Sequence, residues 1–327
     1  MKSMNLIGGR CQAVPDREHG IVFGLDIGKD IITYRACRPD AASKPLTATQ
    51  DMAGFRRIVA AMERYEEQGY EVWVGYEPTG AYSCCVFEFL VEGGWKVVQV
   101  NPKHTSRYND IMDNKPGKSD PRDPLAIAGL IWQGCYRTPL HLMGAYAELR
   151  AASADWAMLA GESTRLRNQL HSMMQLWCPE IGVVFKDALC KSARAIVRKY
   201  RSSDEIAKAG VRRVGSVLAK TSRGGTTNRA QALIEAARES TALSSGRRMR
   251  HRSMLSHLAR LELVEQQRDL LKADMERILS VLPESRRLLS VRGIGVVTCA
   301  SVLGECGNIG DYGAGHDSYA PHAQDMA

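Results

Sequence analysis

Apolar residues in the first hundred positions alternate between a strand pattern and a helix pattern. Short apolar runs predict strands at 21–28, 31–36, 71–76 and 96–100, whereas apolar residues three or four apart predict helices at about 49–67 and 81–91. The break at 28–30 is short enough to make the first two strands a hairpin. The order strand, strand, helix, strand, helix, strand predicts an α/β fold with a mixed sheet.

A different pattern begins near residue 142. Apolar residues recur at intervals of three, four and seven over 149–177 and again over 255–282. This spacing predicts two long helices with coiled-coil-like seams, which are expected to hold a homodimer or tetramer. The expected organisation is an irregular leader, an α/β domain, a helical and coiled-coil-containing region and the start of a further helical domain, at 1–19, 20–140, 141–282 and 283–327.

The basic residues of the chain are concentrated in one region. Residues 186–252 hold 17 Lys and Arg against 5 Asp and Glu, a balance of +12, whereas the rest of the chain has a balance of −4. A segment of this kind favours a polyphosphate partner, because each neutralised phosphate releases counterions. The alternative is a solvated surface with no partner. The residues expected to contact nucleic acid are Lys29, Lys118, Arg247, Arg248, Arg250 and Arg252.

Several protein classes are excluded by composition. There is no run of eighteen apolar residues, and the first ten residues lack the hydrophobic stretch of a secretory signal. We therefore expect a cytoplasmic protein with no membrane partner. Nine scattered cysteines without a Cys-x-x-Cys pair predict neither a disulfide framework nor a zinc ribbon.

Four acidic residues stand where a rigid fold could bring them together. Asp26 ends the first predicted strand and Glu77 ends another, while Asp120 and Asp123 precede a helix predicted at 125–132. If the strands are neighbours, the four carboxylates could meet at one sheet edge, where hard divalent cations would relieve their repulsion. Two magnesium ions roughly 4 Å apart could then activate a nucleophile and stabilise the leaving oxygen of a phosphodiester. Local capping or solvation is the alternative for each residue taken alone.

The order of these motifs resembles transposases of the insertion-sequence 110 family, the DEDD type. The matching segments are G-L-D-I-G-K at 24–29, E-P-T-G at 77–80, N-P at 101–102 and K-S-D-P-R-D at 118–123, and the similarity continues to about residue 312. The resemblance implies a ribonuclease-H-like domain, similar to Holliday-junction resolvases, in which Asp26, Glu77, Asp120 and Asp123 are catalytic and bind Mg²⁺. It also implies DNA cleavage and strand exchange guided by a structured RNA from the same element. The resemblance further implies a prokaryotic protein that is associated with the nucleoid when bound to DNA.

The chain departs from this family pattern at two places. Pro124 stands where members usually have alanine, so Asp120 and Asp123 are expected to flank a helix start. Members also carry a serine nucleophile in a second catalytic domain beyond the G-I-G motif, which is at 293–295 here. That domain is expected to be truncated in this chain, and no residue is assigned the nucleophile's role.

Three further interpretations of the sequence stay open. The glycines at 293 and 295 suit a helix-hairpin-helix that contacts phosphate through backbone N–H groups, or a plain tight turn. The chain could be a catalytically incompetent remnant that only binds DNA or RNA. It could also be a phosphotransferase, because the Asp-x-Gly turn at 26–28 also opens actin-like folds.

Overall fold

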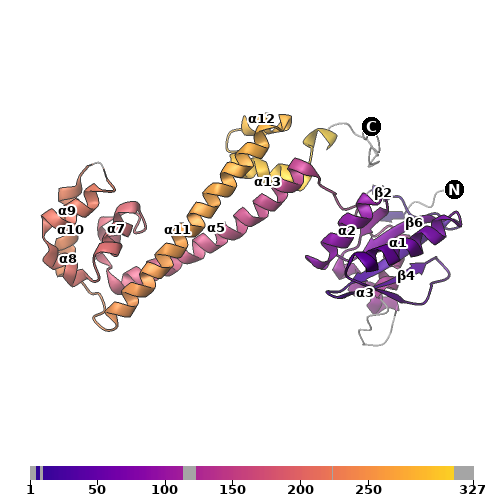
Figure 1. Ribbon diagram of the computed structural model, residues 1–327, viewed down its shortest axis with the longest axis horizontal. Coiled ribbons are helices and arrows are strands. Elements are labelled where there is room, and N and C mark those ends of the chain that lie inside the picture. Colours follow the sequence, from indigo (N-terminus) through magenta and orange to yellow (C-terminus); the bar gives the residue numbers. More distant parts are fainter. Residues whose placement is uncertain (1–4, 8–9, 113–122, 223, 313–327) are drawn as a thin grey trace. The chain divides into compact units, whose positions relative to one another are not determined.

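The computed structural model describes residues 5–7, 10–112, 123–222 and 224–312 (Figure 1). It divides into two compact units, Met1–His141 and Leu142–Ala327. Each unit has its own hydrophobic core, and each is described separately below.

The first unit is built on a five-stranded mixed sheet in the order β5-β4-β3-β6-β7. Its strands are β3 (Gly20–Ile27), β4 (Ile31–Cys37), β5 (Leu46–Thr49), β6 (Glu71–Tyr76) and β7 (Lys96–Gln99). β3 pairs antiparallel with β4 across the short turn at Gly28, and parallel with β6. The predicted hairpin and mixed sheet are therefore confirmed. The short edge strand β5 was not predicted.

Helices cover both faces of this sheet. α1 (Met52–Glu66) and α2 (Tyr82–Glu92) pack on one face, and α3 (Pro102–Met112) and α4 (Asp123–Trp132) lie on the other. α1 begins where the Asp51 carboxylate accepts a hydrogen bond of 2.8 Å from the Gly54 N–H. The arrangement is compatible with the ribonuclease-H-like domain that the family resemblance implies.

The leader differs from the expectation of irregular structure. β1 (Asn5–Ile7) and β2 (Arg10–Gln12) form a two-stranded antiparallel sheet of their own within residues 1–19. Strands of three residues carry too short a period-2 pattern to stand out from the sequence. This part of the leader expectation was wrong.

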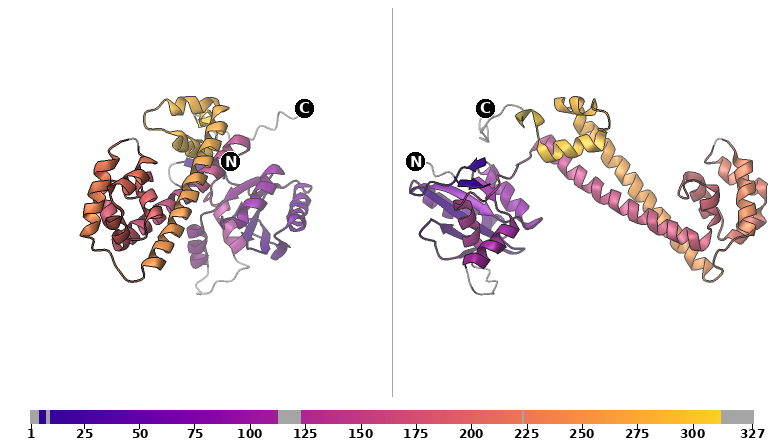
Figure 2. Two further views of the ribbon diagram at one scale, coloured as in Figure 1. Left: turned by 60° about the vertical axis from the view of Figure 1, so that its left-hand side comes forward. Right: turned by 180° about the vertical axis from the view of Figure 1, so that it is seen from behind.

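The second unit is organised around two long antiparallel helices, α5 (Gly144–Trp177) and α11 (Arg247–Ser280) (Figure 2). Near one end of the pair, Leu149 packs with Met275 and Leu279, and near the other Leu170 shares a core with Leu258. The apolar seam predicted from the leucine spacing is thus buried within a single chain. Whether copies of the chain assemble stays a prediction.

Shorter helices gather at the two ends of this pair. At one end lies α6 (Glu180–Val184), followed by four helices of the basic region, α7 (Lys191–Lys199), α8 (Ser203–Ala209), α9 (Val211–Ala219) and α10 (Thr226–Arg238). At the other end lie α12 (Pro283–Leu289) and α13 (Val296–Cys306), which share a core with α5 and α11. The domain boundary expected at residue 283 falls inside this core.

The turn between α12 and α13 requires glycine. Gly293 has a φ of +96°, which L side chains rarely adopt, and Gly295 caps the start of α13. Two short helices joined by a glycine turn are therefore present, as both interpretations of this motif require. Within the described ranges, no helix combines the length and hydropathy needed to cross a membrane.

Candidate functional site

Two of the predicted acidic residues, Asp26 and Glu77, come directly after residues that are paired between two neighbouring strands. In the parallel pair β3 and β6, Gly24 lies opposite Gly75 and Leu25 lies opposite Tyr76. Asp26 directly follows Leu25 and Glu77 directly follows Tyr76, so both residues stand at the carboxyl-terminal edge of the sheet. Both side chains are half-buried.

The face on which these carboxylates lie is set by the two glycines. A side chain at Gly24 would overlap the backbone of Pro124, and one at Gly75 would overlap Ile131, so both glycines face α4. Side chains alternate between the faces of a strand, and Asp26 therefore shares the face of Gly24. Glu77 is one residue past the end of β6. The first turn of α4 thus lies over the strand that carries Asp26.

A hydrogen bond from the loop after β6 holds the two strand ends together. The Thr79 hydroxyl donates to the carbonyl oxygen of Ile27 at 3.0 Å. This bond joins the Glu77-Pro78-Thr79-Gly80 segment to the residue that follows Asp26. The E-P-T-G motif therefore has a local structural role in addition to supplying a carboxylate.

Asp123 begins the helix that covers this edge. α4 starts at Asp123 itself, two residues before the predicted start, with Pro124 inside its first turn. The half-buried Asp123 carboxylate accepts a hydrogen bond of 2.9 Å from the Asn109 side-chain amide on α3. A carboxylate is stabilised here because the amino-terminal end of a helix carries partial positive charge.

The structure brings part of the predicted site to one edge of the sheet. Asp26 and Glu77 stand at one edge and Asp123 begins the helix that packs over Gly24, whereas Asp120 and Lys118 lie outside the described residues. Among the described residues, no three acidic, histidine or cysteine side chains are close enough to hold one metal ion. The described carboxylates therefore do not form a closed ligand cluster.

Sequence reasoning did not single out Asn109, the partner of Asp123. Its helix, α3, was not predicted, although a signal for it is present. The side chain of Asn101 accepts from the Lys103 N–H at 3.0 Å, and Pro102 occupies the first helical position. Asparagine followed by proline is a common helix start, so this pair could have predicted α3 and drawn attention to its polar side chains.

The basic residues divide into those held in ion pairs and those presented to solvent. Arg194 and Arg198 pair with Glu265 and Glu262 of α11, and Arg247 pairs with Asp204. In contrast, Arg248 and Arg252 are exposed one turn apart on α11, and the exposed Lys29 lies in the turn after Asp26. Arg250 donates from Nε to the Ser245 carbonyl oxygen at 3.0 Å.

Comparison with known proteins shows that the chain is similar to transposases and insertion-element proteins. Residues 23–179 match the family of DEDD transposases typified by IS110. The chain is 25% identical over 296 residues to the "Insertion element IS110 uncharacterized 43.6 kDa protein" of Streptomyces coelicolor, covering 87% of this chain and 70% of that protein. It is 24% identical over 318 residues to the "Insertion element IS116 uncharacterized 44.8 kDa protein" of Streptomyces clavuligerus, covering 94% and 78%.

These matches support the class of DNA transposases, enzymes that recombine DNA. The chain is similar to insertion-element transposases of the IS110 family.

Proposed function

We propose that this protein cleaves and exchanges DNA strands in a metal-dependent reaction at the carboxylate edge of its first unit. Asp26, Glu77, Asp120 and Asp123 would hold the metal, and Mg²⁺ is the proposed ion. The observation that carries the proposal is the placement of Asp26 and Glu77 at the carboxyl ends of two paired parallel strands, with the first turn of α4 packed over Gly24.

The chemistry of these side chains fits such an ion. Carboxylate oxygens are the ligands that hard divalent cations prefer in proteins, and Mg²⁺ commonly takes one or two of them together with substrate phosphates and water. A cation bound here would activate the attacking nucleophile and stabilise the leaving oxygen of the phosphodiester. Asn109 would keep the Asp123 carboxylate oriented, because its amide N–H already occupies one oxygen.

The exposed basic residues would provide affinity for the nucleic-acid backbone. Arg248 and Arg252 lie one turn apart on the same helix face, so both could reach neighbouring phosphates. Arg247 and Arg250 would contribute beside them and Lys29 and Lys118 near the carboxylates. A structured guide RNA and assembly into a homodimer or tetramer are further parts of the proposal, and their support is the family resemblance.

The metal proposal is tested by substitutions that keep side-chain size. Asp26→Asn and Glu77→Gln should each lower Mg²⁺-dependent nicking of supercoiled plasmid by at least tenfold, because the ion loses an anionic ligand. Mn²⁺ binding, followed by electron paramagnetic resonance, should weaken in parallel. The matched control is Glu63→Gln, a change of the same charge at an exposed position on α1, the opposite face.

The outcomes separate catalysis from simple binding. Wild-type protein that binds DNA but neither nicks it nor binds Mn²⁺ would favour a DNA-binding remnant over a transposase with this site. Equal nicking by wild type, Asp26→Asn and Glu77→Gln would reject the assignment of these carboxylates. The guide is tested by sequencing RNA that copurifies with the protein, and recovery of only bulk cellular RNA would contradict it.

A further inference from the structure

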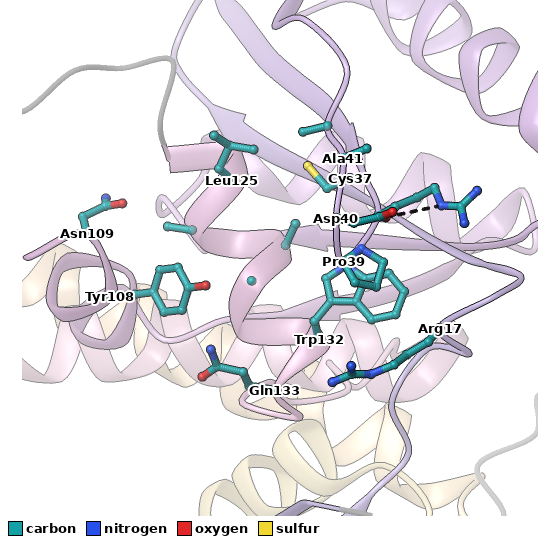
Figure 3. A pocket seen from close by; sticks show the side chains of 15 residues that line it. Arg17, Cys37, Pro39, Asp40, Ala41, Tyr108, Asn109, Leu125, Trp132 and Gln133 are labelled. Atoms are coloured by element: carbon teal, nitrogen blue, oxygen red, sulfur yellow. Dashed lines mark ion pairs between the residues drawn. The ribbon is translucent and has the colours of Figure 1, made fainter. Parts of the chain in front are cut away.

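A pocket of about 730 Å³ opens beside α4 in the first unit, between α3 and the residues that follow β4 (Figure 3). Its volume is within the range of about 300–1,000 Å³ found for small-molecule sites. None of the sequence motifs pointed to it. Asn109 is part of its lining and also donates to Asp123, so the pocket is joined to the carboxylate edge by a single side chain.

Two aromatic rings form walls of this pocket. Tyr108 lies against α4 at Gly129, where any larger residue would overlap the phenol. Trp132 lies three residues further along α4 and also lines the pocket (Figure 3). Gly129 therefore allows the Tyr108 ring to rest directly on the helix that carries Trp132. Aromatic side chains in such a position offer a stacking surface for a planar group.

Buried donors at the wall lack acceptors. The indole Nε1 of Trp132 and the Nε of Arg38 are buried and make no hydrogen bond within the described part of the chain. Arg38 is otherwise held in place, since its Nη1 donates to the Tyr70 hydroxyl at 2.7 Å and its Nε lies 4.0 Å from the Asp40 carboxylate. A buried donor without an acceptor is unfavourable, so these two groups make the wall behind the pocket polar.

The remaining polar groups favour a negatively charged ligand whose edge carries both hydrogen-bond donors and acceptors. Asn109 and Gln133 bring amides, each of which has both donor and acceptor atoms. The charged residues of the lining are Arg17, Arg38 and Asp40, which leave one net positive charge. Arg17 is exposed and so available at the rim. A planar heterocycle carrying one phosphate combines all of these features.

We propose that this pocket receives one unstacked nucleobase of a DNA or RNA strand whose backbone lies at the carboxylate edge. The base would stack on the aromatic wall, Asn109 and Gln133 would contact its polar edge, and Arg17 would contact its phosphate. This inference rests on the proposed function, because the strand is the one that the carboxylates would cleave. Holding one base in the pocket would anchor the strand on the surface that also carries Asn109, the partner of Asp123.

The test measures binding without catalysis, in EDTA, with the full chain. Fluorescence anisotropy compares a single-stranded 12-mer, the matching duplex and the mononucleotide dAMP as competitor. Trp132→Leu, Gln133→Ala and Arg17→Ala should each weaken single-strand binding by about tenfold, and change duplex binding less than twofold. Controls matched in size and charge are Gln68→Ala and Arg56→Ala, at exposed positions outside the pocket.

The outcomes distinguish the pocket from the catalytic site. Trp132 is part of a core, so Gln133→Ala and Arg17→Ala at exposed positions carry the test if Trp132→Leu does not fold. If the pocket variants bind single strands with the same affinity as the Gln68→Ala control, the inference is overturned. The proposal of strand cleavage is not affected by that result. Tighter binding of dAMP than of the 12-mer would overturn the assignment to a strand. If Asp26→Asn no longer cleaves DNA but still binds single strands more tightly than duplex, the pocket binds the strand independently of the catalytic site.

Discussion

The backbone of Pro124 occupies the space into which a side chain on Gly24 would project. This contact sets the distance between the first turn of α4 and the strand that ends in Asp26. Because Asp123 precedes Pro124 and Asp26 follows Gly24 by two residues, the same contact determines how closely the two carboxylates approach. The glycine of the G-L-D motif is therefore a requirement of packing.

Gly24→Ala should disturb both stability and activity. A methyl group at this position must displace the first turn of α4, and overpacking of this kind costs about 1–3 kcal/mol in the free energy of unfolding. Urea denaturation measures this cost, and Mg²⁺-dependent nicking should fall with it. Gly161→Ala is the comparison, because this position in α5 has open space and should cost nothing. Equal stability of the two variants would contradict the packing role.

Asn109→Ala should weaken the metal site without removing a ligand. The substitution deletes the amide that donates to Asp123 at 2.9 Å, so the carboxylate loses its fixed orientation. Partners of this kind are typically worth 10–100-fold in metal affinity or activity. Mn²⁺ titration should show a loss of about tenfold, with Asn228→Ala, an exposed position on α10, as the control. If Mn²⁺ affinity stays within twofold of wild type, Asn109 does not position Asp123.

Glu265 should make the stability of the second unit depend on pH. Arg194 donates two hydrogen bonds to this carboxylate, at 2.7 and 2.9 Å, and Arg167 donates a third at 3.2 Å. The hydrogen bonds from Arg194 outweigh burial and lower the pKa of Glu265. The stabilisation is therefore complete above the unfolded pKa of about 4.3 and is lost as pH falls through the lowered folded pKa.

Glu265→Gln measures this contribution. Removing the charge should cost about 1–3 kcal/mol in the free energy of unfolding at pH 7. The difference from wild type should shrink at pH 3, where protonation has already removed much of the same interaction. Glu239→Gln, at an exposed position, should have no comparable effect at either pH. A difference that is the same at pH 7 and pH 3 would show that the charge is not the cause.

The cysteines should fall into two classes of reactivity. Burial raises the pKa of the Cys37 thiol to about 11, and Cys178 is also buried with a raised pKa, whereas Cys84 and Cys85 are exposed. Since the thiolate is the nucleophile, alkylation of native protein by iodoacetamide at pH 8 should reach Cys84 and Cys85 at least a hundredfold faster. Mass spectrometry of tryptic peptides locates the label. Early labelling of Cys37 would mean that β4 opens readily.

Much of the first unit follows from local sequence patterns, and the parts that do not follow have a physical reason. Continuous apolar runs place β3 and β6, which are buried on both faces, and spaced apolar residues place β4, α1 and α2. β5, with one buried residue in four, carries no comparable pattern. The pocket beside α4 depends on Tyr108 and Gly129 meeting across two helices, and a contact between elements leaves no periodic signal in the chain.

The acidic residues illustrate the same limit in the candidate site. Strand ends predict that Asp26 and Glu77 share an edge, because neighbouring parallel strands end together. The approach of Asp123 depends on the packing of α4 over Gly24, which only the three-dimensional fold supplies. In the basic region, the count of charges did not reveal that Arg194, Arg198 and Arg247 are held in ion pairs.

This division among the basic residues predicts which of them control the salt dependence of DNA binding. Arg248→Ala combined with Arg252→Ala removes two exposed charges from α11 without breaking an ion pair found in the described structure. Each phosphate that is no longer neutralised should reduce the slope of log affinity against log salt by about 0.9. We therefore expect the slope to fall by about 1–2 and the affinity to fall similarly for unrelated duplex sequences.

The control for this experiment is Arg56→Ala combined with Arg64→Ala, which removes the same charge from exposed positions on α1. If long-range attraction by net charge were responsible, both double variants would lose affinity equally. Direct neutralisation of the phosphate backbone instead predicts a reduced slope for the α11 variant alone, because counterions are released only where phosphates are neutralised. An unchanged slope for Arg248→Ala with Arg252→Ala would remove these arginines from the nucleic-acid interface.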